Sequence, residues 1–277
     1  MRVVLHGVRG STCAAGVDFI RVGGHTACVA ITPSGQHAPT LILDAGTGLS
    51  SVSNSLAGQP FRGDILLTHL HWDHVQGLPF FVSGDTDAAE VRVLLPAQGS
   101  ASPHRPGSAA ALLARSMSPP HFPIGPDGLR GRWTFEAIDT GKFGAGGCRV
   151  TALEIPHKGG RTFGYRIEAD GASLAYLPDH DPVGSMDAGV QLAQGVDVLL
   201  HGGMYADSEH AIARRYGHAT VGEAAALGVA ARAGLVVIVH HAPLRTDGQV
   251  EALVRSVSNA GAAVRVGREG DVVLDNA

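Results

Sequence analysis

Three histidines and one aspartate fall within six positions of the chain, directly after the apolar run Ile65–Leu67. These four residues are His69, His71, Asp73 and His74. Imidazole nitrogens and carboxylate oxygens are ligands that suit zinc, manganese or iron, and the cluster lacks the cysteines typical of closed structural zinc sites. The pattern therefore predicts a metal site of another kind.

A buried strand that ends at Thr68 would hold the backbone rigid while the following loop folds these side chains toward one point. A site with two metals needs further ligands, and three candidates follow later apolar runs: His157, Asp179 and His240. Each lies at the carboxyl end of an expected strand, where open α/β sheets present functional groups. A capped or solvated polar residue is the alternative for each one alone, but their recurrence favours the metal site.

Short apolar runs separated by loops continue through both halves of the chain. Helices are expected at Val221–Ala233 and Val250–Ala260. Strands precede helices in each half, and the second half echoes the first. This order favours two mixed sheets packed face to face with helices outside. No linker divides the sequence, so we expect a single domain over residues 1–277.

The segment around residues 96–132 is rich in Pro, Gly, Ser and Ala. A short helix is expected at Ala109–Arg115, whereas Met117–Pro123 cannot be regular because its prolines lack amide donors and fix φ. A long irregular insertion in a compact domain is usually a lid or a binding loop. We expect a lid over the metal site, with a tolerated surface excursion as the alternative.

Composition narrows the partners and the compartment. The net charge of −4 comes without a basic run, so long nucleic acid is not favoured. No apolar run approaches the roughly 20 residues of a membrane span. Cys13, Cys28 and Cys148 are too few and too scattered for a disulfide framework, which favours the reducing cytoplasm.

The ligand series His69-x-His71-x-Asp73-His74, followed by His157, Asp179 and His240, resembles that of the metallo-β-lactamase fold. The resemblance covers nearly the whole chain and implies a four-layer αββα sandwich, with two mixed sheets and outer helices. Shorter segments resemble the branch that holds ribonuclease Z and the cyclic-nucleotide and small-molecule phosphodiesterases. These segments are Gly7–Ser11, Gly23–Thr26, Asp44–Gly48, His157 with Gly164–Ile167, and Gly217–Thr220.

Carried over by position, the resemblance implies two divalent metal ions, with zinc favoured and manganese or iron as alternatives. His69, His71 and His157 would hold one ion, Asp73, His74 and His240 the other, and Asp179 would bridge both. His241 is the adjacent alternative to His240. Neighbours in a strand face opposite ways, so only one of the pair is expected to reach the metals, and His240 matches the family position.

The same resemblance implies hydrolysis of a phosphodiester by a hydroxide that bridges the metals. Asp73, Asp179 and His218 are the expected catalytic residues. His218 would protonate the leaving alkoxide or hold a phosphate oxygen, and its alternative is a polar residue just before the helix at Val221. We expect a small or cyclic nucleotide-type substrate, and a homodimer would match the relatives.

Some positions depart from the family pattern. Gly202 stands where relatives carry an acidic residue, so proton donation by His218 should be weaker or supported by Asp207 or Glu209. His25 replaces the usual asparagine, as a substrate contact or as a satisfied loop histidine. Solvated surface charge is the expectation for the basic residues near the motifs, with phosphate contact as the alternative: Arg9, Lys158, Arg161 and Arg245.

Three other functions compete with this interpretation. A tRNA 3′-end endonuclease is disfavoured because the chain shows no long basic arm. The same metal cage could hydrolyse a non-phosphate ester, lactone or lactam. A metal-bound sensing or binding protein without catalysis is the third, and seven intact ligands weigh against it.

Overall fold

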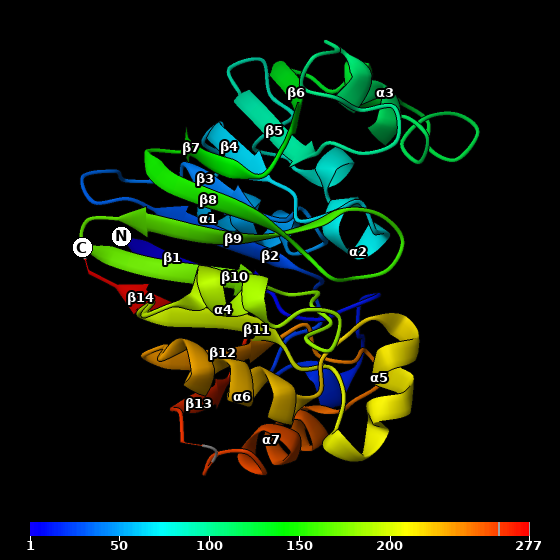
Figure 1. Ribbon diagram of the computed structural model, residues 1–277. Coiled ribbons are helices and arrows are strands. Elements are labelled where there is room, and N and C mark those ends of the chain that lie inside the picture. Colours follow the sequence, from blue (N-terminus) through cyan, green and yellow to red (C-terminus); the bar gives the residue numbers. More distant parts are fainter. Residues whose placement is uncertain (260, 277) are drawn as a thin grey trace.

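Two seven-stranded sheets form the centre of the molecule (Figure 1). The computed structural model describes residues 1–259 and 261–276. The first sheet contains, in spatial order, β14 (Val272–Asp275), β1 (Arg2–Gly7), β2 (Cys28–Thr32), β3 (Leu41–Leu43), β4 (Arg62–Leu66), β5 (Glu90–Pro96) and β6 (Arg132–Ile138). The second contains β13 (Val264–Val266), β12 (Leu235–Val239), β11 (Val198–Gly202), β10 (Ala172–Leu177), β9 (Thr162–Ala169), β8 (Cys148–Ile155) and β7 (Gly141–Ala145).

Both sheets are mixed. Strands β3 to β6 run parallel, whereas β14, β1, β2 and β3 pair antiparallel. Strands β10 to β13 are likewise parallel, and β7 to β10 antiparallel. Because β8 and β10 are both antiparallel to β9, the strands β8, β10 and β12 point the same way. Their carboxyl ends therefore meet at one edge of the second sheet.

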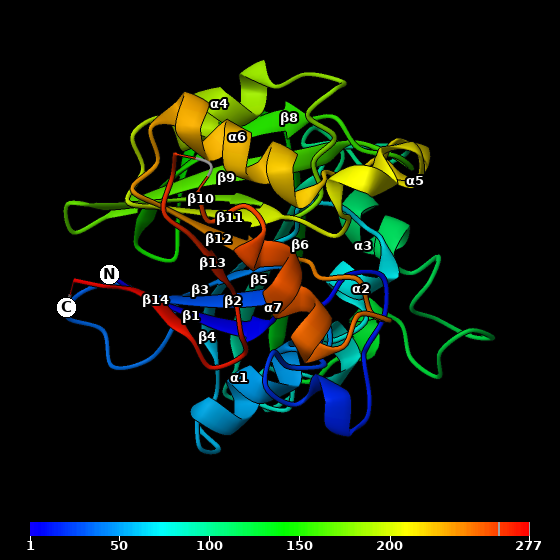
Figure 2. The same ribbon diagram turned by 90° about the horizontal axis from the view of Figure 1, so that it is seen from below.

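Helices cover the outer faces of the two sheets (Figure 2). The helices in the described ranges are α1 (Leu49–Ser55), α2 (Trp72–Val75), α3 (Ser108–Leu113), α4 (Asp187–Ala193), α5 (His210–Tyr216), α6 (Val221–Ala231) and α7 (Asp247–Arg255). Four 3-10 turns complete the set: η1 (Val17–Phe19), η2 (Leu78–Phe80), η3 (Pro126–Gly128) and η4 (Asp207–Glu209). Helices α4 and α6 pack on the second sheet, and α1 lies outside the first. The predicted αββα sandwich is confirmed.

Side chains alternate along the buried strands between two hydrophobic clusters. In β5, Val91, Val93 and Leu95 face the outer cluster, under α1 and α3, while Leu94 faces the core between the sheets. Both faces are covered, so these parallel strands read as continuous apolar runs. The outer cluster also takes in Met117 of the insertion, which attaches that segment to the first sheet.

The helix boundaries differ slightly from those expected. The helix predicted at Ala109–Arg115 is α3, one residue earlier at its start and two at its end. Helix α6 ends at Ala231 because Arg232 takes a left-handed φ of 55°. Helix α7 covers Asp247–Arg255, and Ala260, where the prediction ended, lies outside the described residues. None of the helices in the described ranges is long and apolar enough to cross a membrane.

Candidate metal centre

The histidine cluster lies where β4 passes into α2. His69 follows the strand through Thr68, His71 is the N-cap residue of α2, and Asp73 and His74 lie within that short helix. His69, Asp73 and His74 are buried. The turn of helix directs residues that are only a few positions apart toward one point, as the spacing predicts.

The strand ends of the second sheet bring the other candidates to the same point. Donor atoms lie within 4.8 Å of one another in each of three groups that together contain all seven predicted ligands. The groups are His69, His71 and His157; Asp73, His74 and His240; and His69, His74 and Asp179. A fourth group joins His157 and Asp179 with His218. The predicted division into two metal positions is therefore geometrically feasible.

Asp179 lies between the two positions. Its Oδ2 is 2.9 Å from Nε2 of His74 and 3.1 Å from Nε2 of His240. Its Oδ1 is 3.7 Å from Nε2 of His157 and 3.1 Å from Nδ1 of His218. One carboxylate thus faces donors of both groups, as a bridging ligand must.

His240 faces the centre and His241 faces away from it. Nε2 of His240 is 3.1 Å from Oδ2 of Asp73, whereas Nε2 of His241 lies 3.0 Å from the carbonyl of Gly267. His240 has a φ of 53°, in the left-handed region that costs a non-glycine residue free energy. Gly10 packs against its ring, where a Cβ would overlap the imidazole.

Buried donor atoms without hydrogen bonds fit a cation at this centre. Nε2 of His69 has no hydrogen-bond partner among the described residues, and Nε2 of His74 and Oδ2 of Asp179, although 2.9 Å apart, do not form a hydrogen bond. Buried polar atoms are almost always paired, so such a convergence requires an explanation. Nitrogen and oxygen donors from histidine and aspartate fit divalent metal ions, which the fold also implies.

Burial and the charges that converge at the centre shift the pKa values of the cluster in opposite directions. Burial would raise the pKa of Asp179, but the neighbouring rings, above all His240, hold it well below its usual range. Burial would lower the pKa of His74, yet the carboxylates around it raise it. Burial prevails at His157 and lowers its pKa to about 4. His157 is therefore neutral at pH 7, the form that binds a metal.

Asp44 orients the centre from behind. Its carboxylate accepts hydrogen bonds from the Thr68 amide at 2.7 Å and from the Tyr176 hydroxyl at 2.9 Å. It also lies 2.7 Å from Nδ1 of His74, which leaves Nε2 of that ring directed at the centre. A carboxylate behind a ligating histidine fixes the tautomer and the ring orientation. The carbonyl oxygen of Gly217, 2.7 Å from Nδ1 of His157, likewise fixes the orientation of that ring.

A pocket of about 360 Å³ opens over the centre. Besides five of the predicted ligands, its lining comprises Ser11, Lys158, Gly159, Tyr205, Tyr216 and His218. The Ser11 amide donates to Oδ2 of Asp73 at 2.6 Å, which ties the N-terminal loop to the centre. His218 is brought to the pocket by the left-handed Gly217, at the end of α5. Sequence reasoning missed Tyr205 and Tyr216, which lie in no recognisable pattern.

The acidic side chain that faces His218 is Asp179, rather than the expected Asp207 or Glu209. Gly202 lies so close to the Pro178 carbonyl that a Cβ would overlap it, and this backbone has no room for an acidic side chain there. Asp207 accepts a hydrogen bond from the Gly222 amide, and Glu209 pairs with Arg245. Neither expected substitute is shown bonding to His218, whose Nδ1 faces Asp179 instead.

The basic residues near the motifs have different environments. Arg9 is fully buried against Asp247, so neither the solvated surface charge nor the phosphate contact considered for it is correct. Arg161 pairs with Asp139 and Glu154. His25 lies 3.3 Å from the Thr47 hydroxyl, as a satisfied loop histidine would. Lys158 alone of the four basic residues lines the pocket over the centre.

Similarities to known proteins agree with this geometry. Ribonuclease Z of Mycobacterium bovis is 28% identical over 240 residues, covering 77% of this chain and 80% of that protein. The short form of human tRNase Z has a TM-score of 0.69 at 19% identity, over 99% of both chains. A diphosphatase of the PhnP family has a TM-score of 0.70 at 14% identity, over 99% and 98%. At these identities the structural likeness establishes the fold alone.

The sequence profile described as "Beta-lactamase superfamily domain" matches residues 40–241. This match takes in well over half of the chain and contains every candidate ligand from His69 to His240. The chain therefore belongs to the beta-lactamase superfamily.

Proposed function

We propose that this metal-dependent hydrolase cleaves a small phosphodiester of the nucleotide type. The observation that carries the proposal is Asp179, which lies between two groups of donors and thus favours a two-metal centre. Two divalent ions would lower the pKa of a bound water and neutralise charge on the phosphoryl oxygens. The names of the similar proteins, ribonuclease and diphosphatase, are those of enzymes that break bonds at phosphorus.

Separate residues would bind the metals, orient the ligands, donate a proton and contact the phosphate. His69, His71, Asp73, His74, His157, Asp179 and His240 would hold two ions, of which zinc is our first choice. The Ser11 amide and Asp44 keep Asp73 and His74 oriented. With Nδ1 of His218 held by Asp179, its Nε2 is free to donate a proton to the leaving oxygen. Lys158 lies at the pocket where a phosphoryl oxygen would enter.

A small substrate suits the size of the site, and the names of the relatives make precursor tRNA the second candidate. The pocket of about 360 Å³ has the size of a small-ligand site. The insertion around residues 96–132 lines the neighbouring pocket. We propose that this insertion is a lid over the metal site and that residues 1–277 form a single domain. A cytoplasmic location and a homodimer remain predictions. Cleavage of precursor tRNA faster than of any small ester would favour the ribonuclease Z activity instead.

Removal of the metal ions should abolish activity. We expect purified protein to hydrolyse bis(p-nitrophenyl) phosphate when loaded with zinc or manganese. Activity should disappear after chelation and return when the metal is restored, because the ions lower the pKa of the attacking water and neutralise charge at phosphorus. Release of p-nitrophenolate measures the rate. Protein that holds two ions and yet shows no turnover would contradict the proposal and direct attention to lactones and thioesters.

Replacement of His218 by alanine should lower the rate in a way that depends on the leaving group. General acid catalysis contributes about 100-fold or more where the leaving alkoxide is a strong base. We therefore expect a loss of that order for a dinucleotide, and a much smaller loss for p-nitrophenyl esters, whose leaving group needs no proton. Equal losses for both esters, or none, would rule out the proton-donor role.

A further inference from the structure

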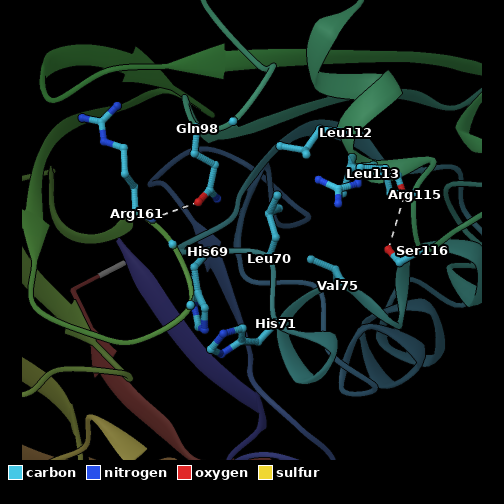
Figure 3. A pocket seen from close by; sticks show the side chains of 13 residues that line it. His69, Leu70, His71, Val75, Gln98, Leu112, Leu113, Arg115, Ser116 and Arg161 are labelled. Carbon is cyan, nitrogen blue, oxygen red and sulfur yellow. Dashed lines mark hydrogen bonds between the residues drawn. The ribbon is translucent and has the colours of Figure 1, made fainter.

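The pocket over the centre continues into two others on the far side of His71. A second pocket of about 360 Å³ shares His71 and Gly159 with the first (Figure 3). A third, of about 540 Å³, shares Val75, Leu113 and Arg115 with the second. Because they share lining residues, the three pockets adjoin in series from the candidate ligands to the insertion, and this series is called the path.

The far end of this path is lined by large aromatic side chains. Trp72 is 74% exposed and Phe80 is 60% exposed, although both belong to a pocket. Phe80 meets Phe122 of the insertion edge to face, with ring centroids 5.7 Å apart. Trp72 directly precedes Asp73 in α2, but its side chain lines the third pocket rather than the pocket over the centre. Exposed aromatic groups gathered at a pocket are typical of binding sites for flat rings.

The positively charged side chain of Arg115 lies between this aromatic end and the metal centre. Figure 3 shows the guanidinium of Arg115 turned into the second pocket, while that of Arg161 points away from it. Arg115 makes no ion pair with any described residue, and no Asp or Glu is found among the described residues that line the second and third pockets. An unpaired arginine without an acidic neighbour is suited to an anionic group of a ligand.

We propose that one ester arm of the substrate lies along this path and makes Trp72 and Arg115 specificity-determining residues. The arm carries a planar aromatic ring, which packs on Trp72 beside the contacting pair of Phe80 and Phe122. It also carries a second phosphate, which pairs with Arg115. The ring is assigned to this path because the path adjoins the metal centre. The second phosphate is assigned to Arg115 because no Asp or Glu lines the second and third pockets in the described part of the chain. The proposal rests on the phosphodiesterase function for its reaction, but recognition of the arm can be measured without turnover.

Three p-nitrophenyl esters that share one leaving group separate these contributions. Methyl p-nitrophenyl phosphate has neither feature. The p-nitrophenyl ester of thymidine 5′-phosphate adds the ring, and its 3′-phosphorylated form adds the second phosphate. Stacking of one base changes affinity by about 5- to 100-fold. In Trp72→Ala we therefore expect the kcat/KM advantage of the thymidine ester over the methyl ester to fall about tenfold.

In Arg115→Ala, the further advantage of the 3′-phosphate should fall about tenfold, because a charge-assisted contact is lost. The matched controls are Val229→Ala and Arg255→Ala, which change an apolar and a basic residue on the outer helices α6 and α7. Neither ratio should change in them. Ratios that stay constant in the Trp72 and Arg115 variants as well would overturn the proposal while leaving the phosphodiesterase function intact.

Fluorescence provides a readout that needs no turnover. The sequence contains two tryptophans, so Trp72→Phe keeps an aromatic ring but leaves Trp133 as the only strong fluorophore. Thymidine 3′,5′-bisphosphate should quench the metal-loaded wild type with saturation and leave Trp72→Phe unquenched. Quenching without turnover of any ester would support this inference and contradict the phosphodiesterase function. Turnover without quenching of Trp72 would overturn this inference alone.

Discussion

Replacement of Asp179 by asparagine should reduce phosphodiester hydrolysis about a thousandfold or more, because it weakens the contact common to both metal positions. The neutral amide can offer one oxygen to one ion but cannot balance charge at both. We expect metal content to fall from two ions per chain to one or fewer. Elemental analysis after gel filtration and the rate on bis(p-nitrophenyl) phosphate measure the two effects.

The control for this variant is Asp139→Asn, which removes a carboxylate from a half-exposed ion pair with Arg161. Pairs of this kind contribute about 1 kcal/mol or less, so metal content and rate should be unchanged. If Asp179→Asn kept two tightly bound ions, Asp179 would not bridge them. If it kept two ions but lost activity, its contact with His218 would become the main role.

The positions of the candidate ligands were predictable because each one follows an apolar run. A buried strand fixes the residue after it at a defined edge, and β8, β10 and β12 point the same way. His157, Asp179 and His240, each of which follows one of these strands, were therefore expected to converge at one edge of the second sheet. Of the two neighbouring histidines, His240 faces the centre, while Nε2 of His241 faces the carbonyl of Gly267.

Other features depend on contacts between distant segments and left no local signal. Strand β14 returns to the first sheet beside β1, although the sequence places it at the end of the second half. Helix α5 is short and polar, yet it brings Tyr216 to the pocket. The reason for Gly202 is the Pro178 carbonyl on the adjacent strand, which no spacing rule reveals. Trp72 resembled a spacer within the metal motif, and only its exposure indicates a binding role.

Asp44 illustrates how a residue outside the metal motif can control the metals. It follows β3 with a φ of 58°, a strained conformation for aspartate. Its side chain is fully buried and meets Thr68, Tyr176 and His74. An asparagine would keep one acceptor oxygen but would present an amide donor to groups that also donate. The Tyr176 hydroxyl or Nδ1 of His74 would then lose its acceptor.

Asp44→Asn should therefore lower metal affinity about 10- to 100-fold, the usual effect of removing a carboxylate behind a ligating histidine. The metal-free protein should also lose about 2 kcal/mol of unfolding free energy, because one buried donor is left unsatisfied. Val254→Ala in α7 serves as the control, since it creates a cavity of similar cost away from the centre. Both variants should unfold at lower temperature without metal. Only Asp44→Asn should also show a smaller rise in Tm when zinc is added, and an equal rise in both would mean that His74 is oriented without Asp44.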